Sequence, residues 1–224
     1  MLADDLIARY PIVYHMAENG TWPSIRERGL LSTKALVDLY EPDADTAEAI
    51  LTRVRKKSVT IESSQYGRSV IRDQLPLKFL DQCLLPGTSP LQFLDALNGR
   101  VFFWLNIERL QKLLNARQYR HKQQTVLHVD TAELIARYGD QVQLAPYNTG
   151  SMHVPNSPPR GVGVFVDLAD YPYDEWVEKR RRTRVDPVVE LTVPYSVPDI
   201  RDFTIRVERW KNGSPVETLC QKNA

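Results

Sequence analysis

The fold is decided by VYHMAE at residues 13–18 and by WPSIRERGLLS at residues 22–32. The first stretch predicts a short strand, because β-branched and aromatic residues precede polar ones. In the second stretch, Ser24 beside Pro23 predicts a helix start, and Gly29 predicts a left-handed cap at the helix end. The strand therefore delivers His15 to the mouth of a loop. There an imidazole can hydrogen-bond a ligand hydroxyl or serve a purely structural role, and the spacing alone favours the structural role.

Length and composition predict an ordinary globular protein. A chain of 224 residues with 42% hydrophobic and 25% charged residues suits one generous domain or two small ones. The net charge of +1 gives no overall attraction to nucleic acid or membrane, so such a contact requires a local patch. Cys83 and Cys220 form neither a disulfide framework nor a metal pattern, which favours a reducing, cytoplasmic setting. No secretory signal or membrane-spanning stretch is expected, and no membrane partner.

The first half of the chain reads as mainly helical after the opening strand. Residues 43–57 predict an amphipathic helix that ends in cations, where the helix dipole favours them. We interpret the run 55–57 as a solvated helix end rather than a binding patch. Residues 60–97 are interrupted by prolines and predict an inserted segment of loops and short helices.

The second half alternates strands with helices. Strands are predicted over 100–105, 126–130, 141–144, 161–166, 188–193 and 204–208, and helices over 107–114 and 131–138. Residues 148–160 contain no predicted element, which favours a functional loop or lid. We therefore expect an α+β fold in a single domain spanning residues 1–224, with its helices mainly in the N-terminal half.

Familiar catalytic motifs are missing from the sequence. It contains neither a Walker-type phosphate loop nor a Gly-x-Gly-x-x-Gly dinucleotide fingerprint. The four histidines (His15, His121, His128 and His153) lack metal-ligand spacing, so no metal is expected. The serines and cysteines show no nucleophile elbow. The common classes of hydrolase are therefore disfavoured.

Two residues in the predicted strands are chemically conspicuous. Glu190 is the one carboxylate in an otherwise apolar or β-branched strand, and such a group is costly unless it is paired or faces a cleft. It either lies on an exposed edge or beside an arginine, or it is functional. Trp104 ends an aromatic strand, where it either packs in the core or offers a platform for a planar ring.

Three segments in this order resemble the ADP-ribosyltransferase superfamily, namely residues 14–16, 102–104 and 189–193. Members keep a histidine or arginine on the first strand, an aromatic residue or serine on a middle strand, and an acidic residue on a late strand. The first segment is similar to the histidine-type branch, which includes RNA 2′-phosphotransferases, rifamycin-modifying transferases and DNA-modifying toxins of the DarT kind. The last segment looks most like the DarT kind. The chain also resembles an uncharacterised bacterial family that shares the RVFFW and NTG segments.

The resemblance implies a split β-sheet core whose cleft holds NAD as co-substrate, with no metal. His15 would take part in catalysis and hydrogen-bond the adenosine-side ribose. Tyr14 would also contact NAD, and Trp104 or Phe103 would stack on the nicotinamide. Glu190 would be catalytic and stabilise positive charge on the anomeric carbon as nicotinamide leaves. The implied function is ADP-ribosyl transfer to a nucleic-acid base in a toxin–antitoxin or phage-defence setting. Transfer to a protein or small molecule, removal of an RNA 2′-phosphate, and a non-catalytic NAD- or nucleic-acid-binding module remain as alternatives.

The acceptor side has weaker signals. Residues 179–184 carry five cations in six positions, among them Arg180, Arg181 and Arg182. They form either a nucleic-acid contact or, as is more usual for a charge run, a solvated loop. Asn148 and Arg160, at the two ends of the long loop, are candidate substrate contacts. Nucleic acid and an antitoxin or immunity protein are the expected partners.

Overall fold

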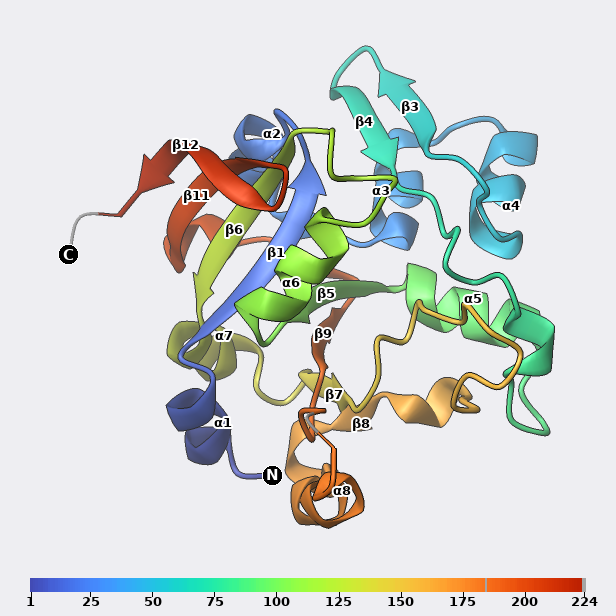
Figure 1. The fold of residues 1–224 in the computed structure, drawn as a ribbon. Coiled ribbons are helices and arrows are strands. Elements are labelled where there is room, and N and C mark those ends of the chain that lie inside the picture. The colour runs from blue at the N-terminus through green and yellow to red at the C-terminus, as the bar shows by residue number, and fades with distance from the viewer. Residues whose placement is uncertain (184, 223–224) are drawn as a thin grey trace.

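The computed structural model describes residues 1–183 and 185–222 and is built around one large antiparallel sheet (Figure 1). Its strands are β1 (Ile12–Glu18), β5 (Arg100–Trp104), β6 (Gln124–Asp130), β7 (Gln143–Ala145), β8 (Val166–Asp167), β9 (Glu190–Pro194), β11 (Thr204–Lys211) and β12 (Ser214–Gln221). They lie in the order β12-β11-β6-β1-β5-β9-β7-β8, and neighbouring strands are antiparallel. Two small ribbons pair β2 (Leu30–Leu31) with β10 (Ser196–Val197), and β3 (Val59–Ser63) with β4 (Gly67–Ile71).

Helices and short 3-10 turns surround the sheet. The α-helices are α1 (Ala3–Arg9), α2 (Trp22–Arg28), α3 (Thr33–Tyr40), α4 (Ala44–Thr52), α5 (Pro90–Asn98), α6 (Ile107–Leu114), α7 (Thr131–Tyr138) and α8 (Tyr173–Arg180). The 3-10 turns are η1 (Leu80–Gln82), η2 (Val162–Val164), η3 (Leu168–Asp170) and η4 (Ile200–Asp202). The expected α+β single domain is confirmed, and α1 to α5 all precede Gly99. In the described ranges, no helix is both long enough and apolar enough to span a membrane.

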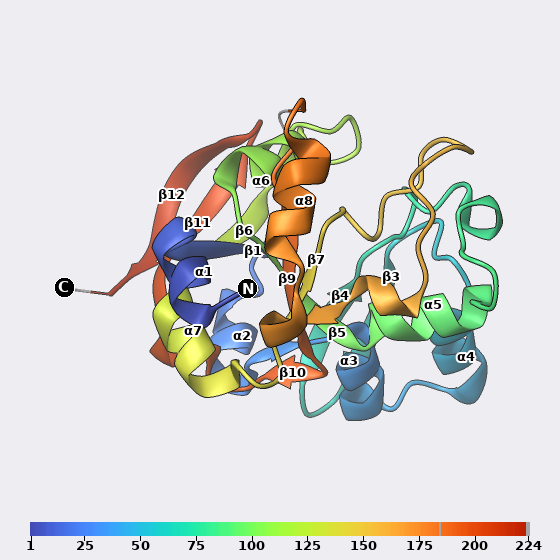
Figure 2. The same ribbon diagram turned by 90° about the horizontal axis from the view of Figure 1, so that it is seen from below.

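The two faces of the sheet bury different cores. On one face, the apolar side chains of α1, α2 and α7 pack against alternate residues of β1, β5, β6 and β9, including Val13, Phe103 and Leu191. On the other face, α6 packs over β1, β6 and β11 through Leu110 and Leu114. Because both of its faces are covered, β6 is buried from Gln124 to Val129, polar residues included. Figure 2 shows α3, α4 and α5 grouped on the far side of the molecule from β11 and β12.

The centre of the sheet contains a gap. Strand β1 pairs with β6 along its whole length, from Ile12 to Glu18, but with β5 only through Tyr14 and Trp104. Beyond that pair the two strands point in different directions (Figure 1). Residues 15–18 therefore present an edge that β5 does not cover, within the middle of the sheet.

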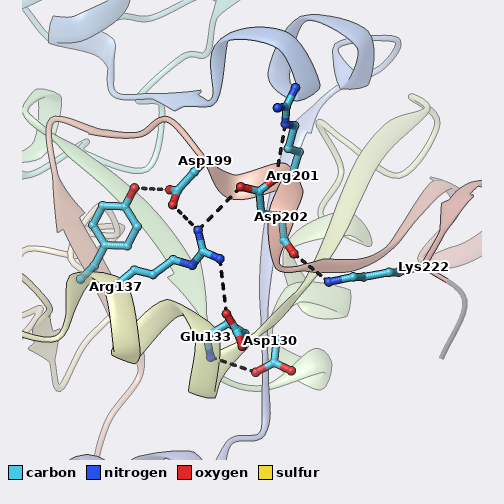
Figure 3. A network of polar contacts seen from close by, with 8 residues as sticks. Asp130, Glu133, Arg137, Asp199, Arg201, Asp202 and Lys222 are labelled. Carbon is cyan, nitrogen blue, oxygen red and sulfur yellow. Dashed lines mark hydrogen bonds and ion pairs between the residues drawn. The ribbon is translucent and has the colours of Figure 1, made fainter.

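A polar network ties α7 to the segment that follows β10 (Figure 3). Arg137 forms ion pairs with Asp199 at 2.7 Å, Glu133 at 3.5 Å and Asp202 at 3.7 Å. Its guanidinium also lies over the ring of Phe203, 5.3 Å from the ring centroid. The network lies where α7 meets η4, at the border of the core that α1, α2 and α7 cover (the larger core).

Three sequence predictions were wrong in the first half. The predicted helix over 43–57 ends at Thr52, because Arg53 adopts an extended backbone, and Arg55 is buried rather than a solvated helix end. The first part of the predicted helical segment 60–97 is the β3–β4 hairpin, whose Ile61 and Ile71 pack against α3 and α4. Only its last part, α5, is a regular α-helix.

Three local predictions also need correction. Helix α2 begins at Trp22, so Ser24 lies within the helix and is not its cap. Gly29 ends the helix as predicted, but with φ 83° and ψ −179°, which is not the left-handed helical cap and is a conformation nearly restricted to glycine. Residues 161–166 form η2 and the start of β8 instead of one strand, because the Val164 N–H donates to the Gly161 carbonyl at 3.0 Å.

Candidate functional site

A cleft of about 600 Å³ opens at the gap between β1 and β5. Its walls come from both faces of the sheet, since its lining includes α2 and β2 on one side and Trp104, Asn148 and Glu190 on the other. The β3–β4 hairpin and α5 close a further wall. A cleft of this size accommodates a nucleotide-sized ligand.

His15 crosses the gap with its side chain. Its Nδ1 lies 2.8 Å from the carbonyl oxygen of Phe102. Because a carbonyl only accepts, Nδ1 carries the proton and donates, which leaves Nε2 as a hydrogen-bond acceptor. Burial lowers the pKa of His15 to about 4, a shift that the charge of Arg72 reinforces, so the imidazole is neutral at pH 7. His15 therefore offers an accepting nitrogen at the cleft.

Glu190 begins β9, directly opposite Trp104 on β5 and Ala145 on β7. Its side chain is enclosed, with 4% of the residue exposed. Oxygen Oε2 accepts hydrogen bonds from the backbone N–H of Thr149 at 3.1 Å and from its Oγ1 at 2.7 Å. Among the described residues, Oε1 has no donor, yet it is not a fully enclosed atom. Since Glu190 lines the cleft, we infer that Oε1 opens into it.

The electrostatics of Glu190 are unusual for a carboxylate. Burial raises its pKa to about 7, against the opposing effects of the Thr149 hydrogen bonds and of the Arg160 and Arg109 charges. The carboxyl group therefore changes charge near neutral pH. Such a group in a cleft is typical of a functional site.

Arg160 shapes the long loop and does not reach into the cleft. Its Nη1 donates to the carbonyls of Asn148 at 2.7 Å, Ser151 at 2.9 Å and Thr149 at 3.1 Å. The residue is only 3% exposed. The prediction that Arg160 contacts substrate is therefore replaced by a positioning role, because its donors are used to fold the loop around Thr149. Asn148 itself lines the cleft, as the prediction for it requires.

The aromatic candidates fall into different places. Trp104 is partly buried and lines the cleft. Phe103 is fully buried in the larger core and lies edge-on to His15, with ring centroids 5.8 Å apart, so it supports the imidazole. Tyr14 points to the opposite face of β1 from His15 and packs edge-on against His128 at 5.1 Å, away from the cleft lining. Trp104 is thus the aromatic candidate that a ligand can contact.

The basic run does not belong to the cleft. Arg180 is buried and donates to the backbone carbonyls of Pro146 and Asp186, so its role is structural. Arg181 is exposed and pairs with Glu178, and Arg182 is exposed as well. Position 184 lies outside the described residues. Figure 1 shows α8, whose last two residues begin this run, at the opposite end of the molecule from the β3–β4 hairpin. None of residues 179–182 lines the cleft.

The family model described as "Family of unknown function (DUF7002)" matches residues 11–204. The chain belongs to the DUF7002 family. No curated protein matches it. The matched range contains His15, Trp104, Thr149 and Glu190, so this DUF7002 member has its whole candidate site within the family region.

Sequence reasoning missed several residues of the DUF7002 site. Thr149, the donor to Glu190, was noted only as part of the NTG segment and was given no role, because it is one polar residue in a polar loop. Arg55 and Arg72 line the cleft from segments that were interpreted as a helix end and as loops with short helices, and Asn98 was given no role. Among the described residues, no three histidine, cysteine, aspartate or glutamate side chains gather as a possible metal site.

Proposed function

We propose that this protein is an NAD-dependent ADP-ribosyltransferase that modifies a nucleic-acid base. One observation carries the proposal. A neutral histidine with an accepting nitrogen and a carboxylate with one open oxygen line the same cleft, at a gap between the two halves of a sheet. The superfamily that the sequence resembles uses a histidine and an acidic residue on these strands, within a split sheet.

His15 would orient the adenosine-side ribose. Its Nε2 accepts a hydrogen bond from a hydroxyl, and the Phe102 carbonyl fixes the ring through Nδ1. Phe103 holds the imidazole from the side. Since the ring is neutral above about pH 4, this acceptor is available throughout the physiological range.

Glu190 would stabilise the charge that develops as the bond to nicotinamide breaks. Loss of nicotinamide gives positive charge at the anomeric carbon, as in glycoside cleavage. Oxygen Oε1 of Glu190 would accept a hydrogen bond from the nicotinamide-ribose hydroxyl, while Thr149 holds Oε2. One preorganised polar group of this kind is worth about 3 to 4 kcal/mol in the transition state. Trp104, directly opposite Glu190, offers its ring to the nicotinamide.

A nucleic-acid acceptor is supported by the charge of the cleft wall. Arg28, Arg68 and Arg72 line it on the side of the β3–β4 hairpin. Cations at a cleft mouth position a phosphate backbone without reading its sequence. We propose this wall as the nucleic-acid contact, one of the two interpretations that the sequence left open for residues 179–184.

The direct test is nicotinamide release from NAD by the wild type and by Glu190→Gln, with and without single-stranded DNA or RNA. We expect release that rises with nucleic acid and falls at least 100-fold in Glu190→Gln, with NAD affinity nearly unchanged. Glu108→Gln, an exposed carboxylate on α6, serves as the matched control. Equal kcat in the wild type and Glu190→Gln would contradict the assigned role.

The acceptor class is read from the same assay. Stimulation by a protein or small molecule, or release of phosphate from RNA bearing a 2′-phosphate, would replace the nucleic-acid base as acceptor. In a toxin setting, expression arrests growth and Glu190→Ala relieves the arrest. A co-expressed antitoxin or immunity protein would likewise restore growth.

A non-catalytic NAD-binding module is the second candidate, and one observation favours it. Burial raises the pKa of Glu190 to about 7, which favours the uncharged carboxyl group at neutral pH more than in an ordinary glutamate. NAD binding without nicotinamide release at pH 8.5, where Glu190 is ionised, would support this module. Release at pH 8.5 would exclude it.

A further inference from the structure

Arg55 is a buried cation without a carboxylate partner. It is 8% exposed, and among the described residues no aspartate or glutamate oxygen lies within ion-pair distance of it. Its Nε donates to the carbonyl of Arg72 at 3.0 Å, and its Nη1 donates to the carbonyl of Ile50 at 2.7 Å. All these acceptors are neutral, although an unpaired buried charge is among the costliest groups in a protein.

Asn98 locks this guanidinium in place. Its Oδ1 accepts from Arg55 Nη1 at 3.0 Å and from Gln74 Nε2 at 3.2 Å. Its Nδ2 donates to the carbonyl of Leu51 at 3.0 Å, and the residue is 2% exposed. The side chains of Arg55, Asn98 and Gln74 thus form a preorganised unit, and all three line the cleft.

The remaining terminal nitrogen of Arg55 is available. Within the described residues, Nη2 has no hydrogen-bond acceptor, and it is not a fully enclosed atom. Because Arg55 lines the cleft, we infer that Nη2 faces it. Burial lowers the pKa of Arg55 to about 10, against a partial compensation from the Asp73 carboxylate, so the group is still a cation at neutral pH.

Arg72 extends the positive wall towards His15. Its guanidinium lies 4.5 Å from the ring centre of Tyr119, and its charge lowers the pKa of His15. Arg28 and Arg68 also line the cleft; Arg28 is paired with Glu27, and Arg68 donates to Thr60. The acidic residues of the lining are Glu18, Asp73 and Glu190, of which Asp73 accepts from the Tyr119 hydroxyl.

We propose that Arg55 and Arg72 form a phosphate-binding subsite of the cleft, beside the β3–β4 hairpin. Guanidinium groups match the oxygens of a phosphate, and a preformed, desolvated cation without a counter-charge favours an anion supplied by the ligand. The inference deepens the proposed function, because it assigns a phosphate group to whatever occupies this part of the cleft. That phosphate belongs either to NAD or to the nucleic-acid acceptor.

The test is calorimetric titration of the full chain with inorganic pyrophosphate, comparing the wild type with Arg72→Gln and Arg55→Lys. We expect pyrophosphate to bind the wild type and to bind Arg72→Gln at least tenfold more weakly. Arg55→Lys keeps the charge but loses the planar fork, so it should weaken binding too. Arg53→Gln, an exposed residue two positions before Arg55 that pairs with Glu48, is the matched control and should bind as the wild type does.

The Arg72 variant keeps the proposal testable if Arg55→Lys does not fold, because the Arg72 carbonyl that Arg55 uses is unchanged. Equal pyrophosphate affinity in the wild type and Arg72→Gln would overturn the subsite. So would failure of pyrophosphate to bind the wild type.

Two further arms identify the source of the phosphate. If ADP-ribose displaces pyrophosphate and a short single-stranded oligonucleotide does not, the subsite binds the phosphates of NAD. If only the oligonucleotide displaces pyrophosphate, the subsite binds a phosphate of the acceptor. Glu190→Gln should bind pyrophosphate normally. If the protein releases nicotinamide but does not bind pyrophosphate, the phosphate subsite is refuted and the proposed activity stands. Pyrophosphate binding without nicotinamide release at any pH refutes the enzyme and keeps the subsite.

Discussion

Thr149 directs both of its donors to one oxygen of Glu190, with Oγ1 at 2.7 Å and the backbone N–H at 3.1 Å from Oε2. The carboxyl group is thereby held in one orientation, with Oε1 left for a ligand. The threonine is itself fully buried, and its carbonyl is held by Arg160 at 3.1 Å. The orientation of Glu190 is therefore set by the loop at residues 148–160 rather than by its own strand.

Replacing Thr149 with valine should raise the pH at which the proposed nicotinamide release reaches its full rate. Valine keeps the shape but removes the Oγ1 donor, which stabilises the ionised carboxyl by about 1.5 to 3 kcal/mol. The pKa of Glu190, already raised to about 7, should rise further by one unit or more. The measurement is the pH profile of kcat. Thr149→Ser restores a donor and should return the profile to that of the wild type; identical profiles for valine and threonine would contradict this role.

Glu190 should make the protein less stable as the pH rises. Its ordinary carboxyl pKa of 4.5 is raised to about 7 on folding, so the folded chain binds more protons between these values. The contribution of the protonated carboxyl to the free energy of unfolding is fully present below pH 4.5 and is lost as the pH rises through 7. The loss is about 1.4 kcal/mol per pKa unit. Urea unfolding at several pH values should therefore show the stability of the wild type falling relative to Glu190→Gln over this window.

His15 should have the opposite pH dependence. Its pKa falls from 6.5 to about 4 on folding, so its contribution is fully present above pH 6.5 and is lost as the pH falls through 4. In His15→Asn, the Nδ2 amide keeps a donor for the Phe102 carbonyl but cannot be protonated. The free energy of unfolding of His15→Asn should therefore increase relative to that of the wild type as the pH falls below 6.5. A constant difference between the two proteins would show that His15 is not buried in solution.

Arg160→Gln should release the loop and weaken ligand binding. The substitution leaves the carbonyls of Asn148, Thr149 and Ser151 without the donor they share. Losing a buried charged donor of this kind should lower the free energy of unfolding by about 3 kcal/mol. Protease cleavage within residues 148–160 should become faster, which a Tm measurement alone would not reveal. Arg181→Gln, an exposed arginine, should change neither property.

Gly29→Ala should be strongly destabilising. A Cβ at this position would lie 2.4 Å from Pro198 Cα and 2.6 Å from the Val197 carbonyl oxygen, and the φ of 83° is strained for alanine. Gly20 is the natural comparison, because its φ is 81° but nothing lies within 4 Å of its Cβ position. Gly20→Ala should lower the free energy of unfolding by about 1 kcal/mol, and Gly29→Ala by considerably more. Similar losses would mean that the backbone near Pro198 moves aside.

Much of the fold could be predicted from the sequence because it depends on local patterns. Strong apolar periodicity located β1, β5, β6, α6 and α7, and the polar interruptions within it singled out His15 and Glu190. The β3–β4 hairpin was missed, since Val59 and Ile61 alternate over only a few residues and the flanking prolines suggested loops. Periodicity cannot tell a short half-buried strand from the end of a helix.

The partners of the candidate residues could not be predicted, because they are far away along the chain. Thr149 and Glu190 are 41 residues apart, and Arg55 and Asn98 are 43 residues apart. Arg160 and Arg180 look like free cations in the sequence, but in the fold they donate to backbone carbonyls that only the tertiary structure brings within reach. The charge of a side chain is visible in a sequence, whereas its accessibility is not.

The single Tyr14–Trp104 pair has a mechanical consequence for the sheet. The strands β12-β11-β6-β1 and β5-β9-β7-β8 form two four-stranded halves of the sheet, and one backbone residue pair joins them. The hydrogen bond from the His15 side chain to Phe102 is an additional link between the halves. A molecule that binds both halves of the sheet provides contacts between them where backbone hydrogen bonds are missing. The binding free energy of such a molecule then adds to the free energy that holds the two halves together.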